Sequence, residues 1–508
     1  MKTDNGQSVS VWLATADMPP AGRLEHDVQT DVCIVGGGIA GLTTAYLLAQ
    51  ARRRVVVLDD GPLAGGETCR TTAHIVNALD DRYYELERLH GERGAHLAAA
   101  SHTAAIEKIA ELVAAEGIAC DFARLDGYLF VPPGDDASVL DKELAACLRA
   151  GLTGVELVER APLGSFDTGP ALRFPRQAQF HVLKYLAGLT AAIKRDGGEV
   201  YTNTHAAEIE GGNDARVVTS DGVTVRAGAV VVATNTPVND RFEIHTKQGA
   251  YRTYVVGARV PKGSVPQILL WDTPDPYHYL RLQAADDHDV LIVGGEDHKT
   301  GQADDMDARY ARLEAWTREC FPEVEGFAFR WSGQVMEPVD GLAFIGRNPL
   351  DSDNVFIATG DSGNGMTHGT IAGLLISDLI LGRENDWAEL YDPARKTLGA
   401  IRDYAGENLN VAAQYTDLVT GGEVEDANAI KPGAGAIIRR GLSKVAACRD
   451  DDGVLHEHSA ICPHLGCVVH WNPNERTWDC PCHGSRYAAQ DGHVVNGPAN
   501  RGLAAAEE

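Results

Sequence analysis

The sequence predicts a chain of three parts: an α/β nucleotide-binding domain, an α+β domain inserted into it, and a small all-β domain at the C-terminal end. Three observations lead to this prediction. An apolar, β-branched strand at residues 31–35 runs directly into a glycine-rich turn and a helix-forming segment. Residues 246–334 alternate in polarity as strands do, and short strands separated by turns follow residue 428. At 508 residues the chain is also too long for one hydrophobic core.

The composition is that of an acidic globular protein, with a formal net charge of −27 and 44% hydrophobic residues. Nucleic acid and anionic membrane surfaces both require basic patches, so neither is an expected partner. The richest apolar run, 371–381, is interrupted by Ser377 and Asp378 and is shorter than the roughly 18 residues that span a bilayer. The N-terminus shows no basic start and no apolar run, and half of the ten cysteines are scattered along the chain. We therefore expect a cytoplasmic protein without membrane insertion.

A phosphate-binding turn is predicted after a polar lead-in at residues 1–27. Strand 31–35 ends at Gly36, and Gly36, Gly38 and Gly41 form the pattern G-x-G-x-x-G, with Ile39 and Ala40 opening the helix. Such glycines allow a tight turn, a close approach of the backbone to a pyrophosphate, and close helix–strand packing. The helix N-terminus would then bind the phosphates.

A second strand, at residues 55–58, ends at Asp59, about 20 residues after the glycines. A carboxylate at this place bonds a ribose hydroxyl, and the neighbouring Asp60 is the alternative for the same role. Strand, turn, helix and acid together predict a Rossmann-like domain that binds a dinucleotide.

Three further stretches resemble the D-amino-acid oxidase/glycine oxidase superfamily of FAD-dependent oxidoreductases. They are the glycine- and threonine-rich loop 61–79, the strand 229–233 with the residues after it, and the segment 338–367. Only one nucleotide fingerprint is present, so the resemblance implies FAD as the sole nucleotide cofactor. In this superfamily a helix, here beginning near His368, directs its N-terminus at the flavin. The implied cofactor-binding residues are Thr71, Thr72, Ala73, Gly360, Gly363, Asn364, Gly365, Met366 and Thr367.

The middle of the chain is expected to form the substrate domain. Helical spacing of apolar residues covers 81–117, and strands are predicted at 251–260, 277–282 and 290–293. The resemblance implies that this sheet covers the flavin and that its side chains contact the substrate. The candidate catalytic residues are Arg281, whose planar fork would bind a carboxylate, and Tyr251 and Tyr254. Arg252, His278 and Tyr279 are further candidates for contact with the substrate. His90, His96 and His102 are expected at the surface or its boundary.

Two cysteine- and histidine-containing loops mark the C-terminal part. The first holds Cys462-x-His464 and the second holds Cys480-x-x-His483. Two cysteines with two histidines are the ligand set of a Rieske [2Fe–2S] centre. A zinc site uses the same residue types, but zinc frameworks usually space their ligands differently, and a c-type haem requires C-x-x-C-H.

Together with their flanking residues, the two loops resemble those of the Rieske family. This resemblance implies that Cys462 and Cys480 bind one iron and that His464 and His483 bind the other. It also implies a disulfide between Cys467 and Cys482, and hydrogen bonds from Ser485 and Tyr487 to sulfur atoms of the site, which would raise the reduction potential of the cluster.

The predicted fold class is therefore an α/β Rossmann-like FAD-binding domain with an α+β substrate domain, plus a small all-β Rieske domain. The expected boundaries place the FAD-binding domain at 28–80, 176–245 and 335–400, the substrate domain at 81–175 and 246–334, a linker at 401–427, and the Rieske domain at 428–508.

The predicted activity is oxidation of a C–N bond of an amine or amino acid, with electrons passing one at a time through the cluster to an external electron-transfer partner. Two alternatives stay open. In one, an external carrier reduces the cluster, which then reduces FAD and an acceptor substrate. In the other, the chain is a flavin oxidase whose cluster is a redox sensor or docking module.

Overall fold

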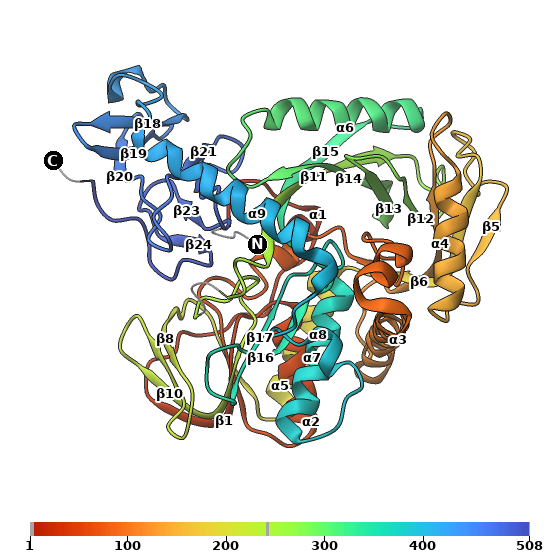
Figure 1. Ribbon diagram of the computed structural model, residues 1–508, viewed down its shortest axis with the longest axis horizontal. Coiled ribbons are helices and arrows are strands. Elements are labelled where there is room, and N and C mark those ends of the chain that lie inside the picture. Colours follow the sequence, from red (N-terminus) through yellow and green to blue (C-terminus); the bar gives the residue numbers. More distant parts are fainter. Residues whose placement is uncertain (1–4, 240–242, 507–508) are drawn as a thin grey trace.

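The computed structural model describes residues 5–239 and 243–506. Residues 1–4 of the expected lead-in, 240–242 and 507–508 lie outside the described residues. Two large sheets with flanking helices form the body, and two small antiparallel sheets form the C-terminal part, drawn in blue in Figure 1. The predicted fold class is confirmed. In the described part of the chain, every helix is too short or too polar to span a bilayer.

The first sheet is the core of the nucleotide-binding domain. Five neighbouring strands of this sheet pair in parallel, and their side chains are almost continuously apolar because both faces are buried. Helices cover one face, and the segment 206–217 packs against the other face. The strand order is β16 (Phe344–Arg347), β17 (Val355–Thr359), β10 (Thr224–Val232), β1 (Val28–Val35), β2 (Val55–Leu58) and β7 (Glu199–Tyr201), with β9 (Arg216–Thr219) and β8 (Ala206–Glu210) beyond β10.

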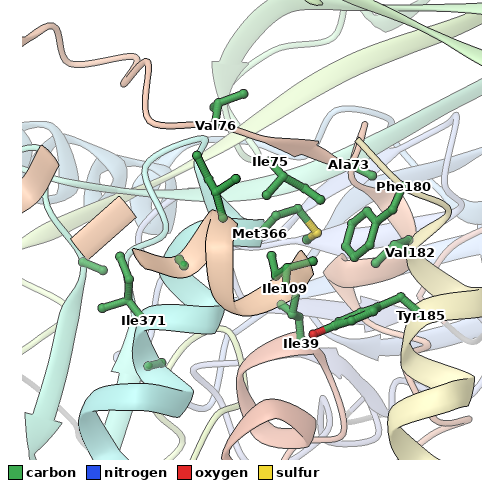
Figure 2. Close-up of a cluster of buried hydrophobic side chains, with 14 of the residues drawn as sticks. Ile39, Ala73, Ile75, Val76, Ile109, Phe180, Val182, Tyr185, Met366 and Ile371 are labelled. Carbon is green, nitrogen blue, oxygen red and sulfur yellow. The ribbon is translucent and has the colours of Figure 1, made fainter. Parts of the chain in front are cut away.

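Four helices pack around one buried cluster beside this sheet. They are α2 (Ile39–Gln50), α3 (Tyr83–Glu116), α5 (Val182–Arg195) and α7 (Gly365–Leu381). Figure 2 shows Ile39 of α2, Ile109 of α3, Tyr185 of α5 and Met366 of α7 gathered with residues of the segment that contains Ala73. The start of α2, the start of α7 and the segment that contains Ala73 therefore pack against the same hydrophobic core.

The second sheet separates a helix-covered face from a face that looks into the molecule. Helix α6 (Met306–Cys320) lies along the outer face (Figure 1). Side chains alternate across a strand, so Tyr254, Val256 and Ala258 pack in the cluster beneath α6, whereas Thr253 points inward. The order is β15 (Gly326–Pro338), β11 (Gln248–Val260), β14 (Asp289–Lys299), β13 (His278–Ala284), β12 (Leu269–Trp271), β4 (Ala123–Phe130), β6 (Ala171–Gln179) and β3 (His74–Ile75), with β5 (Glu156–Val158) on β6 and α4 (Ser138–Arg149) nearby.

The C-terminal part is reached through α8 (Ala388–Tyr391) and α9 (Ile401–Gln414), which runs diagonally across Figure 1. Its sheets are β18 (Gly435–Arg440), β19 (Ser443–Arg449) and β20 (Leu455–Ser459), and β21 (His470–Asn472), β22 (Thr477–Asp479), β23 (Arg486–Ala488) and β24 (Val494–Asn496). Short antiparallel strands were expected in this region, and the structure has them.

The lead-in is more ordered than its polar composition suggested. It contains a short helix, α1 (Val11–Thr15), whose first turn is capped by the Ser10 hydroxyl, and Trp12 is fully buried. Helix α3 also differs from a single continuous helix, because Gly91 has φ +72° and breaks it near its first third. His102, expected at a surface or boundary, is fully buried on α3.

Candidate functional site

One cavity lies between the two large sheets and reaches the C-terminal part. Its walls come from the glycine turn, residues 58–80, the ends of β10 and β17, the inner face of the second sheet, and residues 494–500. Stretches that are far apart in the sequence therefore meet at one cavity. The mixed origin of the walls is the first sign that the C-terminal part belongs to the same functional unit.

The glycine turn is shaped by contacts that side chains would prevent. Gly36 has φ +106°, and a Cβ atom there would lie 2.3 Å from the carbonyl oxygen of Ala233. A Cβ atom on Gly41 would lie 1.9 Å from the carbonyl oxygen of Gly36. Helix α2 begins at the cavity after Gly38, which has no side chain to cap it, and the backbone N–H of Ile39 donates to Thr68 Oγ1 at 3.3 Å. The turn thus suits a bound pyrophosphate.

The two acidic candidates after β2 lie in different surroundings. Asp59 Oδ2 accepts a hydrogen bond of 2.8 Å from the backbone N–H of Gly37, so its carboxylate is held beside the glycine turn. Asp60 faces His205 instead, with 3.6 Å between Oδ2 and Nδ1. Both residues line the cavity, but the placement of Asp59 fits a ribose-binding carboxylate better.

The remaining expected cofactor residues divide into two sets. Most line the cavity, and the residues that do so are Gly36, Gly38, Ile39, Ala40, Thr71, Thr72, Gly360, Gly363, Asn364, Gly365 and Met366. Gly41, Ala73 and Thr367 lie behind the wall: Ala73 is buried in the core, and Thr367 Oγ1 lies 2.8 Å from His102 Nδ1.

Helix α7 points its first turn at the cavity. It begins at Gly365, three residues before the expected start, and follows Gly360 and Gly363, which both have positive φ. Its uncapped N–H groups and positive dipole end favour negative charge at this place. Together with the glycine turn and Asp59, these features fit an FAD, with phosphate groups at α2 and an electron-rich ring edge at α7.

The three expected catalytic residues do not line the cavity. Arg281 is fully buried, and its guanidinium donates to the carbonyl oxygens of Ala73 and Phe180 at 3.0 and 2.9 Å. Tyr254 points to the α6 face, where its hydroxyl lies 2.8 Å from His298 Nε2. Tyr251 bonds Glu407 of α9 at 3.3 Å. None of these positions supports contact with a substrate: Tyr254 lies on the α6 face, Arg281 is buried beneath the backbone of Ala73, and Tyr251 contacts α9.

The other strand candidates also separate. Arg252 is buried in an ion cluster described below, and His278 bonds Asp272 at 2.8 Å. Tyr279 lines the cavity and shares a hydrogen bond of 2.8 Å with Thr253. Only Tyr279 of these three is placed to meet a substrate.

Sequence reasoning missed several side chains of this wall, notably Asp80, Tyr277 and Asp297. Burial, opposed chiefly by Arg82, raises the pKa of Asp80 to about 6, and burial, opposed first by a hydrogen bond with Thr253, raises the pKa of Asp297 to about 7. A signal for Asp80 was available, because it follows directly on the loop that was assigned to the flavin. Asp297 follows closely on the predicted strand 290–293 and two glycines, which carry no local sign of a cavity.

The two cysteine–histidine loops converge as a metal site requires. Cys462 and Cys480 hydrogen-bond through their sulfur atoms, and this bond, with that from Tyr487, lowers the pKa of Cys462 to about 6. The rings of His464 and His483 lie 5.1 Å apart. Two buried thiols beside two imidazoles are the donor set of a Rieske [2Fe–2S] cluster, so the residues present fit that group.

The neighbours of these four residues lie in the same two loops. Cys467 and Cys482 form a disulfide between the two loops. The hydroxyl of Tyr487 lies 3.0 Å from Cys462 Sγ. Ser485 accepts a hydrogen bond from the backbone N–H of Ala499, which ties the second loop to the 494–500 segment of the cavity wall.

The histidine side of the cluster site is covered by the flavin-binding part of the chain. His245 packs edge-on against His464 at 4.9 Å and lies 6.1 Å from His483, as measured between ring centroids. Gln334 of β15 lines the cavity. Its side-chain amide donates a hydrogen bond of 3.0 Å to the carbonyl oxygen of Gly484, the residue after His483. A Cβ atom on Gly484 would lie 2.4 Å from Ala250, so the absence of a side chain permits this contact.

A buried ion cluster joins the same surfaces. Glu475, in the β21–β22 turn, accepts from Arg70 at 3.1 Å and from the hydroxyls of Ser8 and Ser332 at 2.6 and 2.5 Å. Arg252 lies 3.8 Å from the same carboxylate. All of these side chains come from the body except Glu475, so the turn is inserted into a pocket of opposite charge.

Comparison with known proteins defines the class of protein. A family model described as FAD dependent oxidoreductase matches residues 31–379, and one described as Rieske [2Fe-2S] domain matches residues 422–507. The chain belongs to the FAD dependent oxidoreductase family, with a Rieske domain at its C-terminal end, and its cofactors are FAD and a [2Fe–2S] cluster.

Individual relatives share either the whole architecture or its larger part. The chain is 31% identical over 498 residues to the putative Rieske 2Fe-2S iron-sulfur protein YhfW of Bacillus subtilis (strain 168), covering 97% of this chain and 96% of that protein. It is 28% identical to gamma-glutamylputrescine oxidoreductase of Escherichia coli (strain K12), covering 73% and 89%. Glycine oxidase from Geobacillus kaustophilus shares the fold, with a TM-score of 0.61 at 20% identity, over 73% of this chain and 99% of that chain.

Proposed function

We propose that this protein dehydrogenates a C–N bond of an amine or amino acid in the cavity and passes the electrons, one at a time, through the Rieske cluster to an external acceptor. The observation that carries the proposal is the shared wall. Residues 494–500 of the C-terminal part line the cavity, and Gln334 connects the cavity to Gly484 beside the ligand His483.

The proposed reaction needs only water and the electron acceptor as co-reactants. The substrate loses a hydride equivalent from the carbon beside nitrogen and a proton from nitrogen, which gives an imine, and water then hydrolyses the imine to a carbonyl compound and an amine. Bound FAD supplies a two-electron acceptor, and the cluster supplies a one-electron carrier. Two equivalents of a one-electron acceptor complete each turnover.

The residues of this chain have distinct roles in the proposal. The cavity-lining residues of the glycine turn, together with Asp59, hold the nucleotide. The first turn of α7 favours the negative charge that accumulates on reduction. The carboxylate of Asp297, with a pKa of about 7, is suited to accept the ammonium proton of the substrate near neutral pH, because a general base acts best near its own pKa. The inner sheet face excludes bulk water from this end of the cavity.

The name of the Escherichia coli relative, gamma-glutamylputrescine oxidoreductase, specifies an amine, which supports the C–N assignment. We expect anaerobic mixing with a panel of amines and amino acids to bleach the flavin absorbance of the holoenzyme. Substrate should then reduce the cluster too, seen as its electron paramagnetic resonance signal. In the variant His483→Ala, flavin bleaching should persist while reduction of an external one-electron acceptor is lost.

Each contrary outcome identifies a different function. If no amine or amino acid bleaches the flavin, the substrate class is wrong. If an external reductant fills the cluster and electrons then reach the flavin while substrates never reduce it, the flow runs in reverse. If His483→Ala leaves acceptor reduction unchanged and its FAD content matches the native protein, the cluster is a sensor or docking module.

A further inference from the structure

The cavity wall beneath the second sheet combines carboxylates with aromatic rings. Asp80 and Asp297 lie on this wall with Tyr277 and Tyr279, and the Tyr277 hydroxyl donates to Asp80 Oδ2 at 3.2 Å. The ring centroids of the two tyrosines are 5.4 Å apart. Rings and carboxylates both attract cations, the rings through their negative faces.

The aromatic rings are seated by glycines, which is evidence independent of the acidic residues. A Cβ atom on Gly294 would lie 2.3 Å from the ring of Tyr279, and one on Gly127 would lie 2.4 Å from the ring of Trp271. Both rings line the cavity, and His74 lies 5.9 Å from each of them. The backbone of two different strands thus leaves room for an aromatic surface at this place.

The described part of the wall offers no free cation to a carboxylate ligand. Arg70 is the only arginine or lysine among the described lining residues, and its guanidinium is bound by Glu475, Ser8 and the Ser332 carbonyl. Arg281, the expected anchor, lies behind the wall. Burial lowers the pKa of His74 to about 3, which keeps its ring neutral.

Other charges around Asp297 oppose one another. Asp80 and Asp275 add negative charge to its surroundings, and Arg309 adds positive charge but uses its guanidinium on backbone carbonyl oxygens and on Asp305. Arg82 adds positive charge beside Asp80, but its guanidinium donates to the carbonyl oxygens of Leu79 and Asp272. An arriving ammonium group would meet the two cavity acids directly and favour their ionised forms.

We infer that this wall selects a cationic amine that carries no carboxylate on the carbon to be oxidised. The inference rests on the proposed function, whose substrate class it narrows from amines and amino acids to amines such as alkylamines and diamines. Neutral and anionic C–N compounds lose the attraction of Asp80 and Asp297, and an α-carboxylate would meet these acids without a counter-charge.

The test uses two matched comparisons on the holoenzyme. Tetramethylammonium and acetate, at equal ionic strength, are titrated against the flavin absorption spectrum, so binding is read without turnover. Butylamine and norvaline, which differ by one carboxylate on the carbon that bears nitrogen, are compared for the rate constant of anaerobic flavin bleaching divided by the half-saturating concentration.

We expect tetramethylammonium to perturb the flavin spectrum at concentrations at which acetate does not, and butylamine to exceed norvaline at least tenfold. Binding of acetate without binding of tetramethylammonium, or norvaline equal to or better than butylamine, would overturn the inference. If neither compound bleaches the flavin, the proposed function fails, while the two spectral titrations still decide whether the wall selects cations.

Variants of the wall residues test whether these acids cause the preference for cations. Asp297→Asn should weaken tetramethylammonium binding at least tenfold while the FAD content and the cluster spectrum stay native. Asp286→Asn, in the exposed turn between β13 and β14 of the same sheet, is the matched control and should bind as the native protein does. Equal binding by all three proteins would refute the role of Asp297. Asp80→Asn gives a second reading should Asp297→Asn lose FAD.

Discussion

Glu475 offers the most direct test of how the Rieske domain is held. The variant Glu475→Gln keeps the volume of the side chain but removes the negative charge between Arg70 and Arg252. Both carboxylate and guanidinium side chains are fully or almost fully buried there. Breaking a buried ion pair by removing one partner typically costs 3–5 kcal/mol, because the remaining charge is left uncompensated.

The pKa of Glu475 indicates a similar loss of stability. Burial alone would raise the pKa of Glu475, but Arg70, Arg252 and Arg486 lower it from 4.5 to about 2. At 1.36 kcal/mol for each pKa unit, this shift corresponds to about 3 kcal/mol of stabilisation. Because the folded-state pKa is depressed, this contribution is complete above the unfolded-state pKa near 4.5 and disappears as the pH falls toward 2.

The measurement is urea unfolding at pH 7, with limited proteolysis of the 401–427 segment as a report on docking. We expect Glu475→Gln to lose about 3 kcal/mol and to expose this segment to protease. Asp451→Asn removes the exposed partner of the adjacent Arg476 and should leave the unfolding midpoint unchanged. A loss below about 1 kcal/mol in Glu475→Gln would refute the idea that its ion cluster holds the domain.

Three further outcomes are expected. Gly484→Ala should weaken docking by about 1–3 kcal/mol in the same urea assay, with FAD retained, since its Cβ atom would collide with Ala250; an unchanged midpoint would contradict the close contact. The double variant Cys467→Ser/Cys482→Ser should destabilise the C-terminal domain by about 3 kcal/mol, the value for closing a 15-residue loop, measured by urea unfolding with the cluster followed by paramagnetic resonance. Tetramethylammonium should bind more tightly as the pH rises from 5.5 to 8, because Asp297 is neutral below a pKa of about 7 and charged above it. An affinity that stays constant or falls over this range would contradict the role of Asp297.

Much of the fold followed from local sequence rules. The strand 31–35, its glycines and the helix after them form one short unit whose pattern is set by neighbours in sequence. The cysteine–histidine loops are similarly compact, and the Cys467–Cys482 disulfide lies within them. Helix α1 escaped prediction because five residues carry too little periodicity, and its burial depends on contact between Trp12 and His181, which are far apart in sequence.

The substrate wall was harder to predict, because it depends on which face of each strand is turned inward. The resemblance points to the correct sheet, but it does not say that Tyr254 faces α6 or that the segment containing Ala73 covers Arg281. The partners of Arg281 are backbone carbonyl oxygens from residues about 100 and 200 positions away, which no local pattern reveals. The sequence likewise does not reveal that Gly294 makes room for the ring of Tyr279 on β13 and Gly295 for the carbonyl oxygen of Tyr277.

The docking of the two parts bears on the proposed route of electrons. Buried ions rarely add net stability compared with apolar residues of the same volume, and in some proteins they specify one arrangement among several. Here Glu475 fits only where Arg70 and Arg252 converge, and that position brings Gly484 against Gln334 and the histidine ligands against His245. Helix α9 adds a second restraint, because Glu407 pairs with Lys299 of the body while the Tyr415 hydroxyl donates to the Leu465 carbonyl beside the ligands. A cluster domain that had to swing away to meet the flavin would gain nothing from such contacts. The interface therefore favours electron exchange in the docked state, and in the proposed route an external acceptor would approach at Pro463, the exposed residue of loop 463–466.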